Sequence, residues 1–280
     1  MIAVTLMWSI AGVITRHLEH ARSFEVTFWR SFFTVLSLLV ILPFFQGREV
    51  FSKIRHAGAS LWLSGICWSV MFTAFMLALT LTSVANVLVT MALAPLFTAL
   101  AARAALGHRL APRTWVAILL AGAGIAWMYG QELQGGRHLL GTAVALAVPL
   151  AAAVNWTLIQ SLRGSAGAAD MLPAVLLGAL LSSAIMLPLA WPLQASTHDV
   201  GLLAMLGLVQ LAVPCLISVA LARVLPAPEI SLLALLEVLF GVAWVWLFTS
   251  EAPTPAVITG GSLVLLTLAA HEAVGLLRRR

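Results

Sequence analysis

Apolar residues fill this sequence in blocks of about 20, and short polar segments separate one block from the next. Ten blocks can be marked, at about residues 2–16, 25–45, 59–80, 84–106, 114–130, 139–161, 171–193, 201–222, 229–249 and 256–275. A bilayer core about 30 Å thick is crossed by about 20 residues of α-helix, which satisfies its own backbone hydrogen bonds in hydrocarbon. The alternation that a membrane β-barrel needs is absent from these blocks. The pattern predicts an all-α integral membrane protein with ten transmembrane helices, or nine if residues 81–83 do not form a loop.

Composition agrees with this class and narrows the partners. Of the 280 residues, 62% are hydrophobic and 9% are charged, whereas soluble domains average about 25% charged residues. The net charge is +5, but Lys and Arg flank the apolar blocks instead of forming one basic face, so nucleic acid is not an expected partner. The two cysteines, Cys67 and Cys215, lie inside apolar blocks. We therefore expect no disulfide framework, metal site or cofactor, and the bilayer itself is the first partner.

The distribution of Lys and Arg predicts the orientation. With ten helices, one side of the membrane holds eleven of the fifteen basic residues, namely Arg48, Lys53, Arg55, Arg103, Arg109, Arg113, Arg163, Arg223, Arg278, Arg279 and Arg280. The other side holds Arg16, Arg22 and Arg137, with Arg30 just inside the second block. Because Lys and Arg accumulate in cytoplasmic loops, both termini are predicted to be cytoplasmic.

A weak internal repeat appears when the chain is shifted by about 142 residues. Gly65 in the third block then meets Gly207 in the eighth, and Pro95 in the fourth meets Glu237 in the ninth. The repeating unit would hold five helices, an odd number, so the second copy would enter the membrane from the opposite side. We therefore expect two inverted five-helix halves, residues 1–137 and 138–280. Alternating-access transporters use this architecture and place their site at the midplane between the halves.

Glu237 is the most informative side chain in the chain, because it is a lone carboxylate in an otherwise apolar block. A charge at the bilayer centre costs at least about 2.5–3.5 kcal/mol, so such a residue faces protein or water. Helical spacing places Ser231, Ala234 and Gly241 on the same small, polar face. Glu237 is interpreted as a proton-coupling group or as the counter-ion of a substrate amine. The alternative is a neutral carboxyl group that ties two helices together.

Other polar side chains within the apolar blocks either join helices or line a cavity. These candidates are Asn86, Thr90, Asn155, Gln160 and Gln210. Three prolines fall inside predicted helices, Pro95, Pro149 and Pro214. Each should free the carbonyl group four residues earlier, which produces either a passive kink or a hinge that gates a cavity.

Deep aromatic and thioether side chains are the remaining candidates for binding. Trp8, Trp68 and Trp156 lie too far inside their blocks for the interfacial belt and would hold a ring or an ammonium group, or simply fill the core. An adaptable apolar wall is expected from Met71, Phe72, Phe75, Met76 and Met91.

Charged residues near the predicted outer ends have simpler interpretations. Arg16 and Arg30 would extend to the interface or pair with Glu19 and Glu25, and the alternative is contact with a substrate carboxylate at the outer mouth. His17, Glu19 and His20 match no zinc-binding spacing and are interpreted as a solvated loop cluster.

Several short motifs make the chain similar to the EamA family of the drug/metabolite transporter superfamily. They are Trp8-Ser9 followed by Arg16, Arg30, Ala-Pro-Leu at 94–96, Leu-Leu-Glu at 235–237, Ser250-Glu251 and Pro255. Two positions depart from the family pattern: Val238 replaces a proline, and Arg109 stands where an acidic residue is frequent. The resemblance implies ten helices in two inverted halves, and export of small metabolites, including amino acids, at the bacterial inner membrane.

The expected function is thus secondary transport of a small organic molecule, with protons as a possible coupling ion. No phosphate-binding loop is present that would make ATP the direct energy source. An enzyme is not expected, because the blocks hold no paired carboxylates and no Ser/His dyad. A channel or a non-transporting scaffold is the alternative, although a channel would favour rings of charge that a single glutamate does not supply.

Overall fold

The computed structural model describes residues 1–15, 17–21, 23–47, 49–55, 58–82, 84–107, 110–129, 139–162, 171–248 and 254–277. All regular secondary structure within these ranges is helical. The predicted boundary between the halves, at residues 137 and 138, lies outside the described residues, as do Arg16, Arg109, Ser250 and Glu251.

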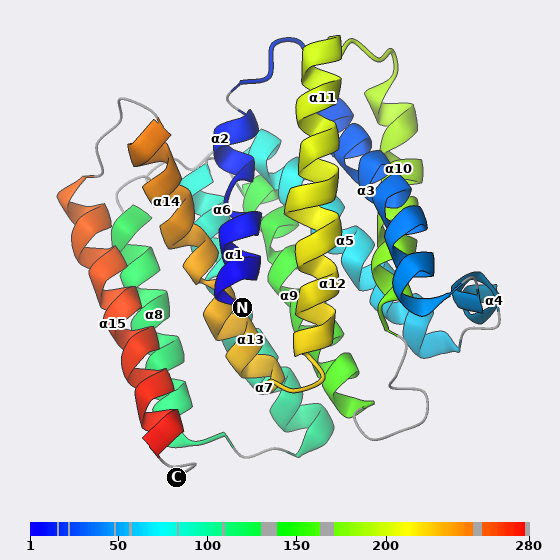
Figure 1. The fold of residues 1–280 in the computed structure, drawn as a ribbon. Helices are drawn as coiled ribbons and strands as arrows, with labels where there is room; N and C mark the ends of the chain where they lie inside the picture. The colour runs from blue at the N-terminus through cyan, green and yellow to red at the C-terminus, as the bar shows by residue number, and fades with distance from the viewer. Residues whose placement is uncertain are drawn as a thin grey trace.

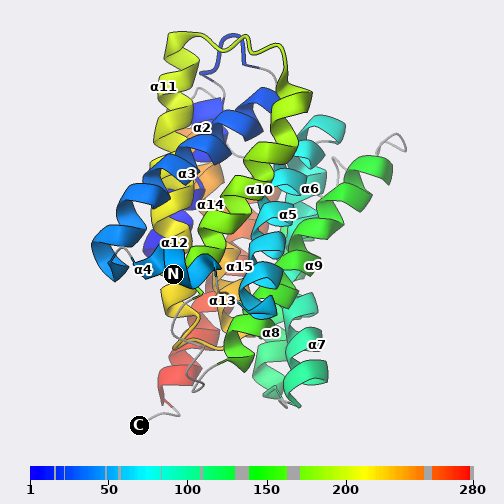
Figure 2. The same ribbon diagram turned by 90° about the vertical axis from the view of Figure 1, so that its right-hand side faces the viewer.

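Each of the ten predicted blocks is helical, and the helices form one elongated bundle (Figure 1). Six blocks are single helices: α3 (Ser23–Gln46), α5 (Ala59–Leu81), α8 (Pro112–Tyr129), α9 (Leu139–Ser161), α10 (Pro173–Ala190) and α15 (Pro255–Leu277). The short helix α4 (Glu49–Arg55) follows α3. Helices α3, α10, α5 and α9 pack as a continuous row, and α8 pairs with α15 (Figure 2).

The other four blocks are interrupted helices, and the interruptions were not predicted as breaks. The first is α1 (Ile2–Trp8) and α2 (Ala11–Thr15), and the fourth is α6 (Val84–Met91) and α7 (Ala94–Leu106). The eighth is α11 (Thr197–Met205), the π-helical segment η3 (Leu206–Ala212) and α12 (Val213–Leu221). The ninth is α13 (Ala227–Ala234) and α14 (Leu236–Phe248).

Local chemistry explains two of the four breaks, and a tight turn forms a third. Pro95 and Pro214 occupy the first turns of α7 and α12, where a missing N–H costs nothing. No proline accompanies the break at Leu235, where the Leu235 N–H bonds the Leu232 carbonyl three residues back. The Leu93 N–H bonds the Thr90 carbonyl in the same 3₁₀ manner. The two turns are separated by 142 residues along the chain, since 235 − 93 = 142.

Several glycines allow close approach of helices, and two of them, Gly65 and Gly207, bear on the arrangement of the halves. A β-carbon at Gly65 of α5 would lie 2.8 Å from Leu177 Cβ of α10, and one at Gly207 of η3 would lie 2.6 Å from Phe33 Cβ of α3. The Thr34 hydroxyl also donates to the Gly207 carbonyl at 3.1 Å. These contacts hold α5 against α10 and η3 against α3, because no side chain separates the backbones.

Two buried carboxylates join the loops at one end of the bundle. Asp199, at the start of α11, is fully buried and accepts backbone N–H bonds from Glu19, His20 and Ala21 at 2.8–3.0 Å. Glu25 of α3 accepts backbone N–H bonds from Gln194 and Ala195. The segment before α3 is thereby fixed to the segment before α11, at the upper end of Figure 1.

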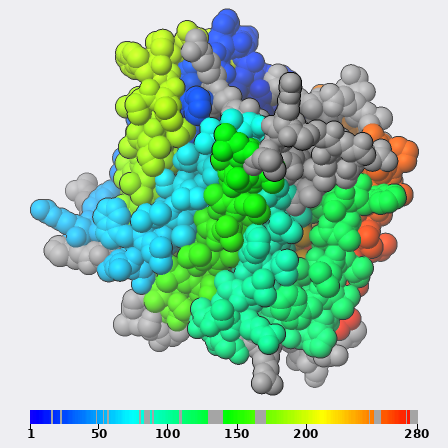
Figure 3. All heavy atoms as spheres, turned by 180° about the vertical axis from the view of Figure 1, so that it is seen from behind, coloured from blue at the N-terminus to red at the C-terminus, as the bar shows by residue number. Residues whose placement is uncertain are grey.

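The exposed surface of the bundle is strongly apolar, as lipid contact requires. By length and composition, six described helical segments could cross a membrane, and four shorter apolar ones accompany them. Exposed leucine, valine, phenylalanine and tryptophan side chains occur on most of these helices, and Figure 3 shows α5 and α9 crossing the rear face side by side. The chain is therefore a multi-pass membrane protein.

Candidate functional site

A cavity of about 150 Å³ lies inside the bundle where the interrupted helices meet. Each of the four interruptions contributes to its wall, through Trp8, Gln210 and Leu211, Met91 and Ala94, and Ala234 and Leu235. The uninterrupted helices α3, α5 and α9 complete the wall. The cavity therefore sits where the backbone of four helices is least regular.

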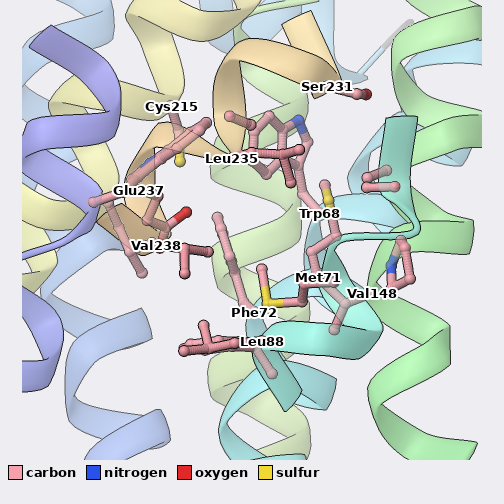
Figure 4. Close-up of a pocket in the computed structure, with 18 of the residues that line it drawn as sticks. Trp68, Met71, Phe72, Leu88, Val148, Cys215, Ser231, Leu235, Glu237 and Val238 are labelled. Carbon is pink, nitrogen blue, oxygen red and sulfur yellow. The ribbon is translucent and has the colours of Figure 1, made fainter. Parts of the chain in front are cut away.

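Aromatic side chains form much of the wall. Trp68 and Trp156, on α5 and α9, meet edge to face with ring centroids 5.6 Å apart, and Phe72 lies 5.5 Å from Trp68. Met71 and Met91 add flexible thioethers. In Figure 4, Trp68, Met71 and Phe72 extend from α5, facing the residues of α13 and α14. This wall suits the apolar part of a small organic molecule.

Glu237 projects into this cavity from the first turn of α14 (Figure 4). Ser231 and Ala234 line the same wall, as their predicted common face requires, although the chain is interrupted between them and Glu237. Ser231 also bonds Thr98 of α7 at 2.8 Å. The carboxyl group thus reaches a space that a ligand could enter.

Arg30 lines the same cavity, which differs from the predicted interfacial position. Its side chain is 2% exposed, and one guanidinium nitrogen donates to the Phe72 carbonyl at 3.1 Å. Extension to the interface is wrong, because α5 and η3 pack over this part of α3. Pairing with Glu25 is also wrong, since that carboxylate bonds the loop at Gln194 and Ala195.

Of the remaining residues predicted to line a cavity, some lie on the cavity wall and others do not. Gln210 lines the cavity, and its side-chain amide donates to the Trp8 carbonyl at 3.4 Å. The cavity wall does not include Asn155, whose side-chain oxygen accepts a 2.6 Å bond from the Ser64 hydroxyl between α9 and α5. Gln160 accepts the Ala227 N–H at 2.7 Å at the start of α13. Thr90 is buried but away from the wall, and the side chain of Asn86 lies outside the described residues.

The three prolines also take different positions. Pro149 lines the cavity within the continuous helix α9. Pro95 and Pro214 are buried beside it, each at the start of a helix that follows an interruption. Bends were predicted in the fourth and eighth blocks. In the structure, the fourth block is broken into two helices, α6 and α7, and the eighth contains the π-helical segment η3.

Sequence reasoning missed some of the cavity wall. These residues include Leu88, Val148, Ala152, Leu211, Cys215 and Val238, whereas Arg30 was expected to meet substrate only as an alternative, and at the outer mouth. Apolar residues give no signal that separates a cavity wall from a packed core, whereas an arginine seven residues inside α3 does give one. Arg30 lies about two helical turns after Ser23, the first residue of α3, and an arginine at that depth indicates a position facing protein or a cavity.

Comparison with known proteins shows a family similarity in the first part of the chain and a similar fold over nearly its whole length. Residues 1–130 match the model of the EamA-like transporter family. A solved crystal structure has a similar fold, with a TM-score of 0.80 over 98% of this chain and 96% of that chain, at 17% sequence identity. A search of curated proteins found no match. The first 130 residues are therefore similar to the EamA-like transporter family, which is part of the drug/metabolite transporter superfamily.

Proposed function

We propose that the protein is a secondary transporter that exports small organic metabolites, with amino acids as the favoured class, by alternating access around the described cavity. The observation that supports this most directly is the coincidence of the cavity with four helix interruptions. Irregular backbone at membrane depth is tolerated where it lines a cavity or is buried in protein. Interruptions at the site allow the two ends of a helix to move separately, as alternating access needs.

The packing of the two glycines supports two inverted five-helix halves of the predicted extent. Gly65 and Gly207 are equivalent under the 142-residue shift, since 207 − 65 = 142. In the predicted scheme, the third helix packs on the seventh through Gly65, and the eighth packs on the second through Gly207. Exchanging the halves converts one helix pair into the other. The matching 3₁₀ turns at Leu93 and Leu235 support the same relationship.

Glu237 is proposed to bind the amino group of the substrate. A carboxylate on a largely apolar wall attracts a cation, and Trp68 and Trp156 provide ring faces nearby on the same cavity. A proton could occupy the same carboxylate when the amine is absent, so protons are the proposed coupling ion. The driving force would then be the proton gradient across the inner membrane of a bacterium.

The proposed orientation places both termini in the cytoplasm. Exposed Arg103 and Arg223 lie near the ends of α7 and α12, at the same end of the bundle as the last turn of α15 (Figure 1). Loops rich in arginine favour the cytoplasmic side.

Reconstitution tests the function. Purified protein in liposomes loaded with one unlabelled amino acid at a time should take up the same labelled amino acid transiently against its gradient, and the rate should saturate. Flux that does not saturate would indicate a channel, and absence of flux for amino acids and other metabolites would indicate a scaffold.

A pair of variants on α9 connects the flux to the cavity. Ala152 lines the cavity, whereas Val154 is 44% exposed on the outer surface. Ala152→Phe should reduce counterflow strongly because the ring occupies the binding space, and Val154→Phe should leave it unchanged. Equal activity of both variants would contradict transport through this cavity.

A further inference from the structure

We propose that Arg30 binds the anionic group of the transported molecule and selects substrates that carry a carboxylate. This inference rests on the proposed function, because it names the group that confers selectivity at the proposed site. Arg30 differs from the predicted binding residues in being a full positive charge on the cavity wall, two helical turns inside α3.

The hydrogen bonds of Arg30 leave much of its donor capacity available. A guanidinium group has five N–H donors. One terminal nitrogen donates to the Phe72 carbonyl at 3.1 Å, while Nε is buried without a partner. Across the described part of the chain, no carboxylate lies within the 4.0 Å that defines an ion pair with Arg30. The cation therefore lacks the anion that a buried arginine normally has.

The nearest candidates for that anion are already accounted for. Glu25, five residues earlier on α3, holds the loop at Gln194 and Ala195. Glu237 reaches the same cavity from α14 but forms no ion pair with Arg30. A cationic and an acidic side chain thus line one small space without forming an ion pair. A molecule with an anionic and a cationic group can bind both side chains at once.

A purely structural role explains less of this arrangement. A single bond to the Phe72 carbonyl could be made by a neutral glutamine, without the cost of burying a charge. The planar fork of arginine instead matches a carboxylate, to which it can donate two parallel hydrogen bonds. Most of the remaining wall is apolar, and a cavity of about 150 Å³ has room for a benzene-sized group. The expected ligand is a small molecule with one carboxylate and a compact apolar part.

Matched ligands test the proposal in purified, detergent-solubilised protein. The standard L-amino acids are compared one by one with their methyl esters, which keep the ammonium and side chain but lack the carboxylate charge. Affinity is measured from the ligand-dependent rise in melting temperature. The natural protein should bind at least one amino acid about tenfold or more tightly than its ester, a difference within the range of charge-assisted hydrogen bonds.

Substitution of Arg30 should remove this preference. In Arg30→Gln, acid and ester should bind within about twofold of each other, and Arg30→Lys should retain only part of the preference because its ammonium lacks the fork. The control is Ser31→Ala, which removes the buried bond between Ser31 and Ser182 while leaving the cavity intact. That variant should keep the full ratio of affinities. If Arg30→Gln does not fold, Arg30→Lys tests the proposal, because it should lower the ratio of the affinities for the acid and its ester.

The outcomes separate this inference from the proposed function. Equal affinity for acids and esters in the natural protein, or an unchanged preference in the Arg30 variants, would overturn the role of Arg30. If no amino acid binds but liposomes show counterflow of amines or uncharged solutes, transport stands and the carboxylate anchor is wrong. Absence of both binding and flux would overturn the two together.

Discussion

Gly207 of η3 lies so close to Phe33 of α3 that a β-carbon at residue 207 would be 2.6 Å from Phe33 Cβ. The backbone of Thr34 and Arg30 would be within 2.9 Å of the same atom. Because backbone cannot move aside as a flexible side chain can, Gly207→Ala should force η3 away from α3. We expect a loss of about 1–3 kcal/mol, the usual cost of overpacking, measured as a lower melting temperature in detergent.

The matched control for this substitution lies in the same interrupted helix. A β-carbon at Gly201 of α11 would have nothing within 4 Å, so Gly201→Ala should be neutral or stabilising by up to about 1 kcal/mol. Equal melting temperatures for the two variants would show that the close contact at Phe33 does not limit packing.

Asp199 provides a second stability prediction, at the loop end of the bundle. Its carboxylate is fully buried and accepts N–H bonds from three consecutive residues of the segment before α3. Asp199→Asn replaces one acceptor oxygen by a donor that faces a backbone N–H. The expected loss is about 1–3 kcal/mol, from a buried donor left without a partner.

Exposed Glu19 is the control for Asp199. Its side chain is 56% exposed beside Asp199, and Glu19→Gln should change stability by less than about 0.5 kcal/mol. Thermal unfolding of both variants measures the difference, and a similar small effect at Asp199 would mean that the loops are held by other contacts.

Asn155 and Ser64 test whether a buried amide joins helices or binds substrate. The Ser64 hydroxyl donates to the Asn155 side chain at 2.6 Å, away from the cavity wall. A double-mutant cycle with Asn155→Ala and Ser64→Ala should give a coupling of about 0.6 kcal/mol, the average for hydrogen bonds between membrane helices, and at most about 1.7 kcal/mol. The concentration of substrate for half-maximal counterflow should stay within about twofold of the natural value, whereas a large rise would assign Asn155 to the binding site.

The polar face around Glu237 shows what sequence periodicity could predict. Ser231, Ala234 and Glu237 share one wall of the cavity, as their spacing indicates. The presence and approximate bounds of the helices could also be predicted from the sequence, because each apolar block is long and polar segments separate the blocks. The break at Leu235 could not be predicted from the sequence, because no proline or glycine marks it.

Asn155 and Gln210 show where prediction from sequence ends. Both are amides inside apolar helices, yet one bonds a neighbouring helix and the other reaches the cavity. The sequence shows that an amide in an apolar helix needs a hydrogen-bond partner, but it does not show which neighbouring group is that partner. Arg30 was misplaced for the same reason: its depth along α3 was visible, but not that α5 and η3 pack over α3 and keep its side chain inside the bundle.

Glu237→Gln tests the proposed coupling to protons. Among the described residues, Arg30 is the charged group that acts on Glu237, and the two side chains form no ion pair. Glutamine keeps the size and hydrogen-bonding capacity of the side chain but cannot release a proton. An imposed pH gradient should therefore no longer drive net accumulation in liposomes, while counterflow should continue with weaker affinity for the amine.

The control variant is Glu229→Gln, eight residues earlier on α13. It removes a carboxylate that lies away from the cavity, so it should preserve the response to the pH gradient. Accumulation in Glu237→Gln equal to that of the natural protein would show that proton movement does not pass through this residue.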